Sequence, residues 1–262
     1  MENKEVDSAA VQAPEAAADK GEKKAVDNAV QLKGNLVKAP EFKTLSSGTL
    51  AARARIAAND KYANKAGETI EETVYVDLEA YGKAAESLKS ICEGKDEKKF
   101  LDVYGQLSHQ KWTDKDGKAK SKTFVTATHV ELYDAAKRQE AGRPYKPNSV
   151  KVVGNLVADP VVHEFEDGGK AVSVSIAFNS KDKDGKEKEP QFFELSATGK
   201  AAAELAKAKK GDFYSIKGKL KLEQWHDKET GESRSKLVVK PLEATNLARS
   251  KEKSDPDFSY ER

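Results

Sequence analysis

The sequence lacks most of the features on which disulfide-bonded, secreted and membrane proteins depend. Among its 262 residues there is one cysteine, Cys92, which excludes an internal disulfide and fits a reducing, cytoplasmic location. No apolar stretch approaches the roughly 20 residues of a membrane helix, and we expect no secretory signal because the N-terminus has no apolar core. The 46 Lys and Arg against 44 Asp and Glu give a formal net charge of +2. Binding of a polyanion through bulk positive charge is therefore excluded, and such binding needs locally placed cations.

Signatures of catalysis are also missing. The sequence has no His/Cys cluster of metal-ligand spacing, no phosphate-cradling glycine loop, and no Ser or Cys nucleophile with a partner His at a recognisable spacing. Carboxylates are abundant, but they lie in charged turns and tails without a pairing pattern. Cys92 lies in an apolar helical pattern without a nearby His, so we interpret it as a small core residue. We expect a binding protein without catalytic residues, metal or cofactor.

The clearest feature that the sequence does contain is an internal repeat. Both tryptophans fall at the same place in it, Trp112 in the first copy and Trp225 in the second, each followed by an acidic turn. The spacing between equivalent residues drifts from 120 to 113 as the loops shorten. The other matched segments, in order, are 34–40 with 154–160, 56–59 with 176–179, 82–85 with 199–202 and 105–107 with 218–220. A period above 100 residues indicates a duplicated domain rather than a solenoid.

The repeat and the composition divide the chain into five parts. Residues 1–28 are rich in Ala, Glu, Lys and Asp without hydrophobic periodicity, which predicts a disordered acidic tail. Residues 29–133 form the first domain and residues 148–248 the second. Between them, residues 134–147 are a polar linker with two prolines, and residues 249–262 are a C-terminal tail.

Each repeat has the pattern strand, strand, strand, helix, strand, strand. The segment 171–179 alternates apolar and small polar residues, as does 72–80, which is typical of half-buried strands. Short helices are predicted at 83–92 and 200–208. This order is that of the OB-fold, so we predict an all-β protein with one short helix per domain, built as two tandem five-stranded OB-fold barrels. An unrelated small β-sandwich is the alternative, but it does not predict a helix at this point.

Several motifs resemble those of bacterial single-stranded DNA-binding proteins. The match covers nearly all of the first repeat and, more loosely, the second. It rests on Gly34-Asn35-Leu36 before Pro40, Ser47-Gly48-Thr49, EETVYVDL at 71–78 before YGKAAE at 81–86, and VYGQL at 103–107 before KWTDKDG at 111–117. The resemblance implies sequence-tolerant binding of single-stranded DNA. It also implies an assembly of four OB-fold domains, which this tandem chain would reach as a homodimer.

The resemblance assigns base stacking to four aromatic residues of the first domain, Tyr62, Tyr75, Tyr81 and Trp112. Tyr75 has an independent argument, because it shares the polar face of its strand with Asp77 and Glu79. An aromatic ring there contributes little to folding, and stacking explains it. Trp112 as the cap of a hairpin cluster, and Tyr81 as a core ring with its hydroxyl at the rim, are the structural alternatives.

Candidate phosphate contacts accompany these rings. Arg53 and Arg55 are two apart on one strand face, Lys61 adjoins Tyr62, and Lys111 and Lys122 belong to the lysine-rich hairpin at Trp112. The hairpin lysines alternate with Asp114 and Asp116, which also fits a solvated loop. His109 is interpreted as a barrel or rim residue rather than a ligand.

The second domain departs from this pattern. Phe192 and Trp225 stand where the first domain has Tyr75 and Trp112, and we include them in the predicted site. Thr198 replaces Tyr81, however, and Ser173 and Ser175 replace the two arginines. We therefore expect weaker binding by the second domain. The C-terminal end SDPDFSYER also lacks the acidic tip of the family, which leaves protein partners in replication or repair open.

Two other functions stay open at the level of sequence. Aromatic platforms stack RNA bases as well as DNA bases, so an RNA-binding OB protein is one alternative. A structural protein that uses OB-fold barrels for protein contacts is the other, favoured by the poorer second domain.

Overall fold

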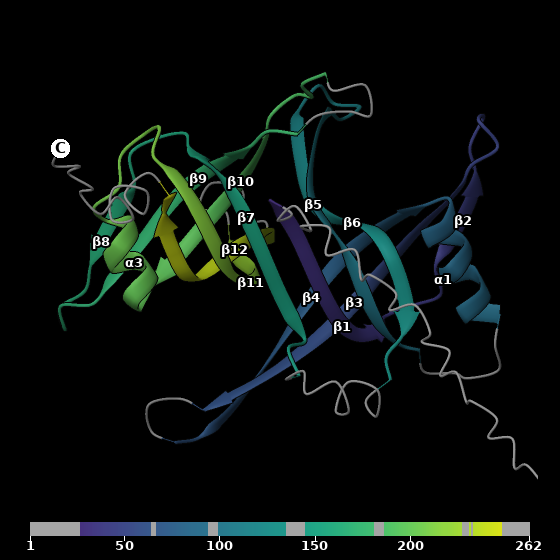
Figure 1. Cartoon of the computed structure of the whole chain (residues 1–262), viewed down its shortest axis with the longest axis horizontal. Coiled ribbons are helices and arrows are strands. Elements are labelled where there is room, and N and C mark those ends of the chain that lie inside the picture. The colour runs from purple at the N-terminus through teal and green to yellow at the C-terminus, as the bar shows by residue number, and fades with distance from the viewer. Residues whose placement is uncertain are drawn as a thin grey trace, which may run out of the picture.

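The computed structural model describes residues 27–63, 67–93, 99–134, 145–180, 186–226, 231 and 233–247. The predicted linker lies mostly outside these residues, and the predicted C-terminal tail and nearly all of the N-terminal tail lie outside them as well. Figure 1 shows two β-barrels side by side, with the helices α1 (Lys83–Glu93) and α3 (Gly199–Leu205) at the outer ends. In the described part of the chain no helix is long and apolar enough to cross a membrane.

The strands of each repeat follow one another in the same order. The first repeat contains β1 (Asn28–Leu36), β2 (Glu41–Thr44), β3 (Leu50–Ala63), β4 (Thr69–Tyr81), β5 (Phe100–Thr113) and β6 (Ala119–Leu132). The second contains β7 (Asn148–Leu156), β8 (Val161–Glu164), β9 (Lys170–Phe178), β10 (Gln191–Thr198), β11 (Phe213–His226) and β12 (Ser233–Asn246). Helix α1 follows β4, and α3 follows β10.

Each repeat closes into a five-stranded barrel. The first runs β3-β4-β6-β5-β1 and closes where β1 also pairs with β3, while the second runs β9-β10-β12-β11-β7 and closes between β7 and β9. The inward side chains are mostly aliphatic or small, the second barrel adds Phe178, Phe193 and Tyr214, and both helices bury alanine and leucine against this core. This architecture confirms the all-β fold with two tandem OB-fold barrels.

A backbone junction joins the two barrels. Strands β1 and β7 pair antiparallel with Val30 opposite Val150, so that the sheet continues from one barrel into the other. Val30 and Val150 are equivalent in the repeat. Beyond this junction the Lys33 amide donates to Pro147 O, and the Val153 amide donates to Asp27 O, both at 2.7 Å. In the repeat, Lys33 is equivalent to Val153 and Asp27 is equivalent to Pro147. The two bonds are therefore related to each other by a pseudo-two-fold axis through the junction.

The repeated glycines of the GNL motif lie where the barrels close. A Cβ atom on Gly34 would lie 2.1 Å from Ala57 O, and one on Gly154 would lie 2.0 Å from Ala177 O. Strand β1 crosses here from its pairing with β5 to its pairing with β3, and β7 does the same in the second repeat. Only glycine allows the backbones to approach so closely.

Two features differ from the sequence-based prediction. A short strand, β2 or β8, precedes the second barrel strand in each repeat and forms a hairpin with it. The first strand begins at Asn28, within the predicted tail, and Asn28 is 2% exposed. Its side chain donates to Leu107 O and accepts from the Leu107 amide, both at 2.8 Å. Asn148 makes the same two bonds to Leu220, so the repeat begins at these asparagines.

Candidate nucleic-acid interface

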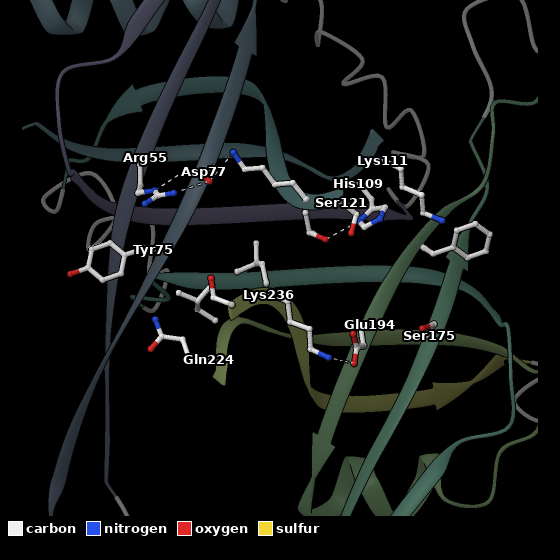
Figure 2. Close-up of a pocket in the computed structure, with 16 residues that line it drawn as sticks. Arg55, Tyr75, Asp77, His109, Lys111, Ser121, Ser175, Glu194, Gln224 and Lys236 are labelled. Atoms are coloured by element: carbon white, nitrogen blue, oxygen red, sulfur yellow. Dashed lines mark hydrogen bonds and ion pairs between the residues drawn. The ribbon is translucent and has the colours of Figure 1, made fainter. Parts of the chain in front are cut away.

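A cleft of about 620 Å³ lies between the two barrels (Figure 2). Each barrel contributes one wall, and the walls consist of the same eight positions of the repeat. The first wall contains Arg55, Tyr75, Asp77, His109, Lys111, Ser121, Lys122 and Thr123. The second contains their equivalents Ser175, Phe192, Glu194, Leu222, Gln224, Ser235, Lys236 and Leu237. The cleft therefore follows from the pseudo-two-fold axis, which turns one face of each barrel toward the other.

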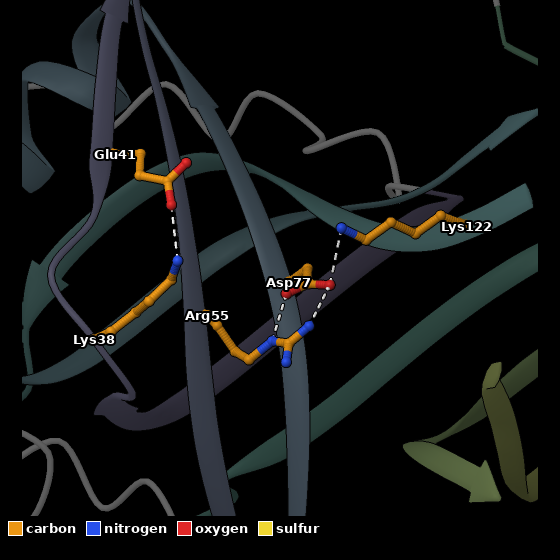
Figure 3. A network of polar contacts seen from close by, with 5 residues as sticks. All are labelled: Lys38, Glu41, Arg55, Asp77 and Lys122. Carbon is orange, nitrogen blue, oxygen red and sulfur yellow. Dashed lines mark hydrogen bonds and ion pairs between the residues drawn. The ribbon is translucent and has the colours of Figure 1, made fainter. Parts of the chain in front are cut away.

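Asp77 on β4 organises the cations of the first wall (Figure 3). The Arg55 guanidinium donates to both carboxylate oxygens, from Nε at 2.6 Å and from Nη2 at 3.0 Å. Lys122 Nζ lies 2.9 Å from Oδ2 of the same carboxylate. Partial burial works to raise the pKa of Asp77, but the hydrogen bonds from Arg55 and Lys122 outweigh it and hold that pKa below its ordinary value. The triad carries one net positive charge.

The second wall repeats this arrangement with fewer cations. Lys236 Nζ contacts Glu194 Oε1, in the positions of Lys122 and Asp77. Ser175 stands where the first wall has Arg55, so the pair has no second cation. Lys236 also lies 3.9 Å from Glu223 and 5.6 Å from the centre of the Trp225 ring. The charges of Lys236 and Glu194 therefore cancel, and Glu223 beside them adds a negative charge.

The aromatic residues of the two walls have different neighbours. Tyr75 is 47% exposed and lies on the strand face opposite the buried Val74 and Val76. Phe192 is 39% exposed, and Lys111 Nζ of the first wall lies 5.6 Å from its ring centre. Cations attract ring faces in this geometry. Tyr75 is thus the more open of the two rings.

The two tryptophans extend the surface beyond the cleft along the β5–β6 and β11–β12 hairpins. Trp112 is 43% exposed in a hollow that shares Lys111 and Ser121 with the cleft. Trp225 is 42% exposed in a second hollow, which shares Leu222, Gln224 and Lys236 with the cleft. An exposed indole ring lined by lysine suits stacking with a base beside a phosphate contact.

Besides the two tryptophans, four more predicted residues lie outside the cleft. Tyr62 and Lys61 lie on the outer part of the β3–β4 hairpin. We call this part, residues 59–63 and 67–73, the arm. Tyr62 is 41% exposed, and Lys61 Nζ lies 3.5 Å from Glu71. At the other end of β4, Tyr81 is 44% exposed and its hydroxyl donates to Glu79, which raises its pKa. Arg53 Nε also lies 3.2 Å from Glu79. It lines a hollow that includes Lys38, Arg55 and Lys122 and so adjoins the first wall.

His109 is a partly buried residue of the first wall. Its Nδ1 lies 3.0 Å from Thr123 Oγ1, and its amide donates to Gln191 Oε1 of the second repeat at 3.2 Å. Burial, with the nearby Lys111, lowers its pKa. Burial also raises the pKa of the Cys92 thiol, which packs against the core. Among the residues that the structure describes, no group of three or more His, Cys, Asp or Glu side chains has the arrangement of a metal site.

The structure gathers five of the eleven predicted residues in the cleft: Arg55, Tyr75, Lys111, Lys122 and Phe192. Trp112, Trp225 and Arg53 adjoin it, whereas Tyr62, Lys61 and Tyr81 lie further along the strands. Sequence reasoning did not identify Glu194 and Lys236, and it counted Asp77 only as a marker of the polar face of the strand. A signal existed, because the repeat aligns Asp77 with Glu194 and Lys122 with Lys236.

Comparison with known proteins agrees with the repeat and the fold. The model of the single-strand binding protein family matches residues 27–133 and again residues 147–244. A single-stranded DNA-binding protein of Thermus aquaticus is 26% identical over 222 residues, which cover 82% of each chain. One from Thermosynechococcus vestitus is 35% identical over 111 residues, covering 42% of this chain and 89% of the relative.

Solved structures support the same architecture. The wild-type single-stranded DNA binding protein from Thermus aquaticus superposes with a TM-score of 0.64 at 23% identity, over 84% of this chain and 92% of that one. A deletion mutant of that protein gives a TM-score of 0.65 at 22% identity, over 90% and 98%. With both repeats matched by the family model, this chain belongs to the single-strand binding protein family.

Proposed function

We propose that this protein binds and protects single-stranded DNA in replication, repair or recombination, without regard to sequence and without catalysing a reaction. The observation that carries the proposal is the surface formed by the cleft and its two flanking hollows. It presents four exposed rings, Tyr75, Trp112, Phe192 and Trp225, among lysine and arginine side chains. Family membership supports the same function, and from that function we infer a location in the cytoplasm, at the nucleoid.

The rings and the cations have separate tasks in this mechanism. Every base has a π-face, so stacking on an aromatic ring is tolerant of sequence and contributes about 1–3 kcal/mol per base. Tyr75 and Trp112 stack bases in the first repeat, with Tyr62 and Tyr81 further along the path. Lys111 carries no carboxylate partner among its described contacts and meets phosphate directly. Arg55 and Lys122 must exchange Asp77 for phosphate, since Asp77 already accepts their hydrogen bonds.

Binding energy is concentrated in the first repeat. Its wall has a net positive charge and an open tyrosine, whereas the charges of the second wall cancel and Phe192 already has Lys111 over its ring. The second repeat also has Thr198 in place of Tyr81. We place its main contacts at Phe192 and Trp225.

The chain forms a homodimer with four OB-fold barrels. The support is the family resemblance together with the tandem repeat, which supplies two barrels per chain. Sedimentation equilibrium of the purified protein tests this, with twice the monomer mass as the expected result and a monomer mass as the contradicting one.

Titration with oligo(dT) at low and high salt, followed by tryptophan fluorescence, tests the function. We expect strong quenching that weakens with salt, mostly lost in Trp112→Ala and only partly lost in Trp225→Ala. Equal loss in the two variants would contradict the ranking of the repeats but not the binding. No quenching and no salt-sensitive binding would leave an assembly protein as the better account, and competition with oligo(U) separates DNA from RNA preference.

A further inference from the structure

The arm of the first barrel reaches the second barrel. Strands β3 and β4 have 14 and 13 residues, whereas their equivalents β9 and β10 have 9 and 8. Figure 1 shows the long β3–β4 hairpin projecting away from the first barrel toward the side of the second. Tyr62 lies near the outer end of this hairpin, opposite Ile70. A two-stranded hairpin with no barrel beneath it is marginally stable by itself, so the placement of Tyr62 depends on what the arm contacts.

Lys219 of β11 makes that contact with two arm residues at once. Its Nζ forms an ion pair with Asp60 Oδ2, and the same atom lies 5.9 Å from the centre of the Tyr62 ring. The side chains of Asp60 and Lys219 are 15% and 30% exposed, which makes this pair less open to solvent than the ion pairs of Arg53 or Lys61. Shielded pairs are screened less by salt. Lys219 therefore fixes the arm and attracts one face of its ring.

The contact exists on one side of the pseudo-two-fold axis. The repeat aligns Asp60 with Ser180 and Lys219 with Gln106, so the equivalent pair of side chains carries no charge. If the ion pair served only to hold the barrels together, an equivalent ion pair on the other side of the axis would strengthen the junction further. Instead, the ion pair occurs at the end with an arm and a tyrosine.

We propose that Lys219 of the second barrel is a positioning residue for DNA binding by the first barrel. It holds Asp60 and lies over one face of Tyr62, which leaves the other face of the ring to a base. The second repeat, poor in binding groups of its own, contributes to affinity by fixing the arm of the first. This inference rests on the proposed function, since it concerns how Tyr62 meets single-stranded DNA.

The test compares Lys219→Met with Lys217→Met in the full-length chain. Lys217 lies two residues earlier on β11 and pairs with Glu243 at 3.4 Å, so its removal deletes the same charge without touching the arm. Binding of fluorescein-labelled oligo(dT) is measured by anisotropy, and thermal unfolding confirms that both variants fold. We expect Lys219→Met to bind about fivefold more weakly, from the loss of a cation–π contact and a shielded ion pair. Lys217→Met should change affinity by less than about twofold.

Two further variants separate positioning of Tyr62 from general electrostatics. In a Tyr62→Ala background, Lys219→Met should have little additional effect, because the ring through which Lys219 acts is gone. The charge swap Asp60→Lys with Lys219→Asp should recover most of the affinity, since it restores an ion pair between arm and barrel. Equal losses in Lys219→Met and Lys217→Met, or an undiminished loss in the Tyr62→Ala background, would overturn the inference. Failure of the unaltered protein to bind oligo(dT) would instead reject the proposed function.

Discussion

At the scale of single residues, three cations of the cleft, Arg55, Lys122 and Lys236, are paired with carboxylates. Asp77 accepts hydrogen bonds from Arg55 and Lys122, and Glu194 contacts Lys236 in the equivalent place. Without DNA, these pairs keep long cationic side chains ordered at the surface. In the proposed binding mode, the same carboxylates repel the DNA phosphates. The affinity of the surface is therefore below what its cations alone would give.

Removing the Asp77 charge should increase affinity. In Asp77→Asn, Arg55 and Lys122 become free to pair with phosphates, and we expect about threefold to tenfold tighter binding of oligo(dT) at low salt, with a steeper salt dependence. The control is Glu164→Gln, which removes one charge from an exposed pair with Lys170 on the β8–β9 hairpin. Anisotropy titrations at several salt concentrations measure both quantities. Weaker binding by Asp77→Asn would show that Asp77 organises the site rather than competing with DNA.

His109 should make stability depend on pH near neutrality. Burial lowers its pKa in the folded protein, so the unfolded chain binds more protons below the ordinary histidine value of about 6.5. The contribution of His109 to stability is complete above that pH and is lost as pH falls through the folded pKa. Urea unfolding between about pH 7 and 5 should show a smaller decline for His109→Gln than for the unaltered protein. Parallel curves for the two proteins would contradict this, since the remaining histidines are common to both.

At the scale of elements, glycine is required at different positions of the fold for two different physical reasons. Gly154 has an ordinary backbone conformation but no room, because a Cβ would lie 2.0 Å from Ala177 O. Gly117 has open space but a φ of +76° in the β5–β6 turn. We expect Gly154→Ala to lower the free energy of unfolding by about 2–4 kcal/mol, as overpacking at a barrel closure does.

The matched variant Gly117→Ala should cost only about 1–2 kcal/mol, from its left-handed backbone. Urea denaturation followed by circular dichroism gives both values. A tolerated Gly154→Ala would mean that the barrel relaxes at this seam, and the GNL motif would then need another explanation.

Sequence alone predicts the elements with strong periodicity but not those fixed by single contacts. The alternation at 72–80 and 171–179 identifies β4 and β9, and the repeat places both helices. The strands β2 and β8 are short and largely exposed, so neither has a hydrophobic pattern. In the sequence, Asn28 cannot be distinguished from the polar tail before it. Its structural role depends on hydrogen bonds to the backbone N–H and C=O of Leu107, which is 79 residues away.

The site shows the same limit for a different reason. Exposed rings on polar strand faces, such as Tyr75, can be identified from alternation. Contacts between the repeats cannot, because nothing local in the sequence encodes that Lys111 meets Phe192 or that Lys219 meets Tyr62. These contacts depend on the antiparallel β1–β7 junction, which brings one face of each barrel opposite the other.

At the scale of the whole molecule, a pseudo-two-fold axis relates two unequal surfaces. The backbone is arranged almost as in a symmetric pair, so equivalent positions form the two walls of one cleft. The side chains break this symmetry, with Arg55 against Ser175, Lys111 against Gln224 and Tyr75 against Phe192. A DNA strand has a direction, and in the proposed binding mode it meets the second wall in the opposite sense to the first. In that mode, the wall with the higher affinity determines the direction in which the strand lies.

Substitutions at the two aromatic positions of the cleft should measure this inequality. Tyr75→Leu removes an open stacking ring beside a positively charged triad and should weaken oligo(dT) binding about fivefold to 150-fold, the range expected for one stacked base. Phe192→Leu removes a ring that Lys111 already contacts, on a wall that carries no net positive charge. The affinity for oligo(dT) should therefore fall by less than about threefold. Both variants have an apolar leucine in place of the ring, so their thermal unfolding midpoints should agree with each other. A difference in their affinities then reflects DNA contacts rather than stability. Equal losses would mean that both walls stack DNA alike, and the direction of the bound strand would have to be set elsewhere, at Trp112 or on the arm.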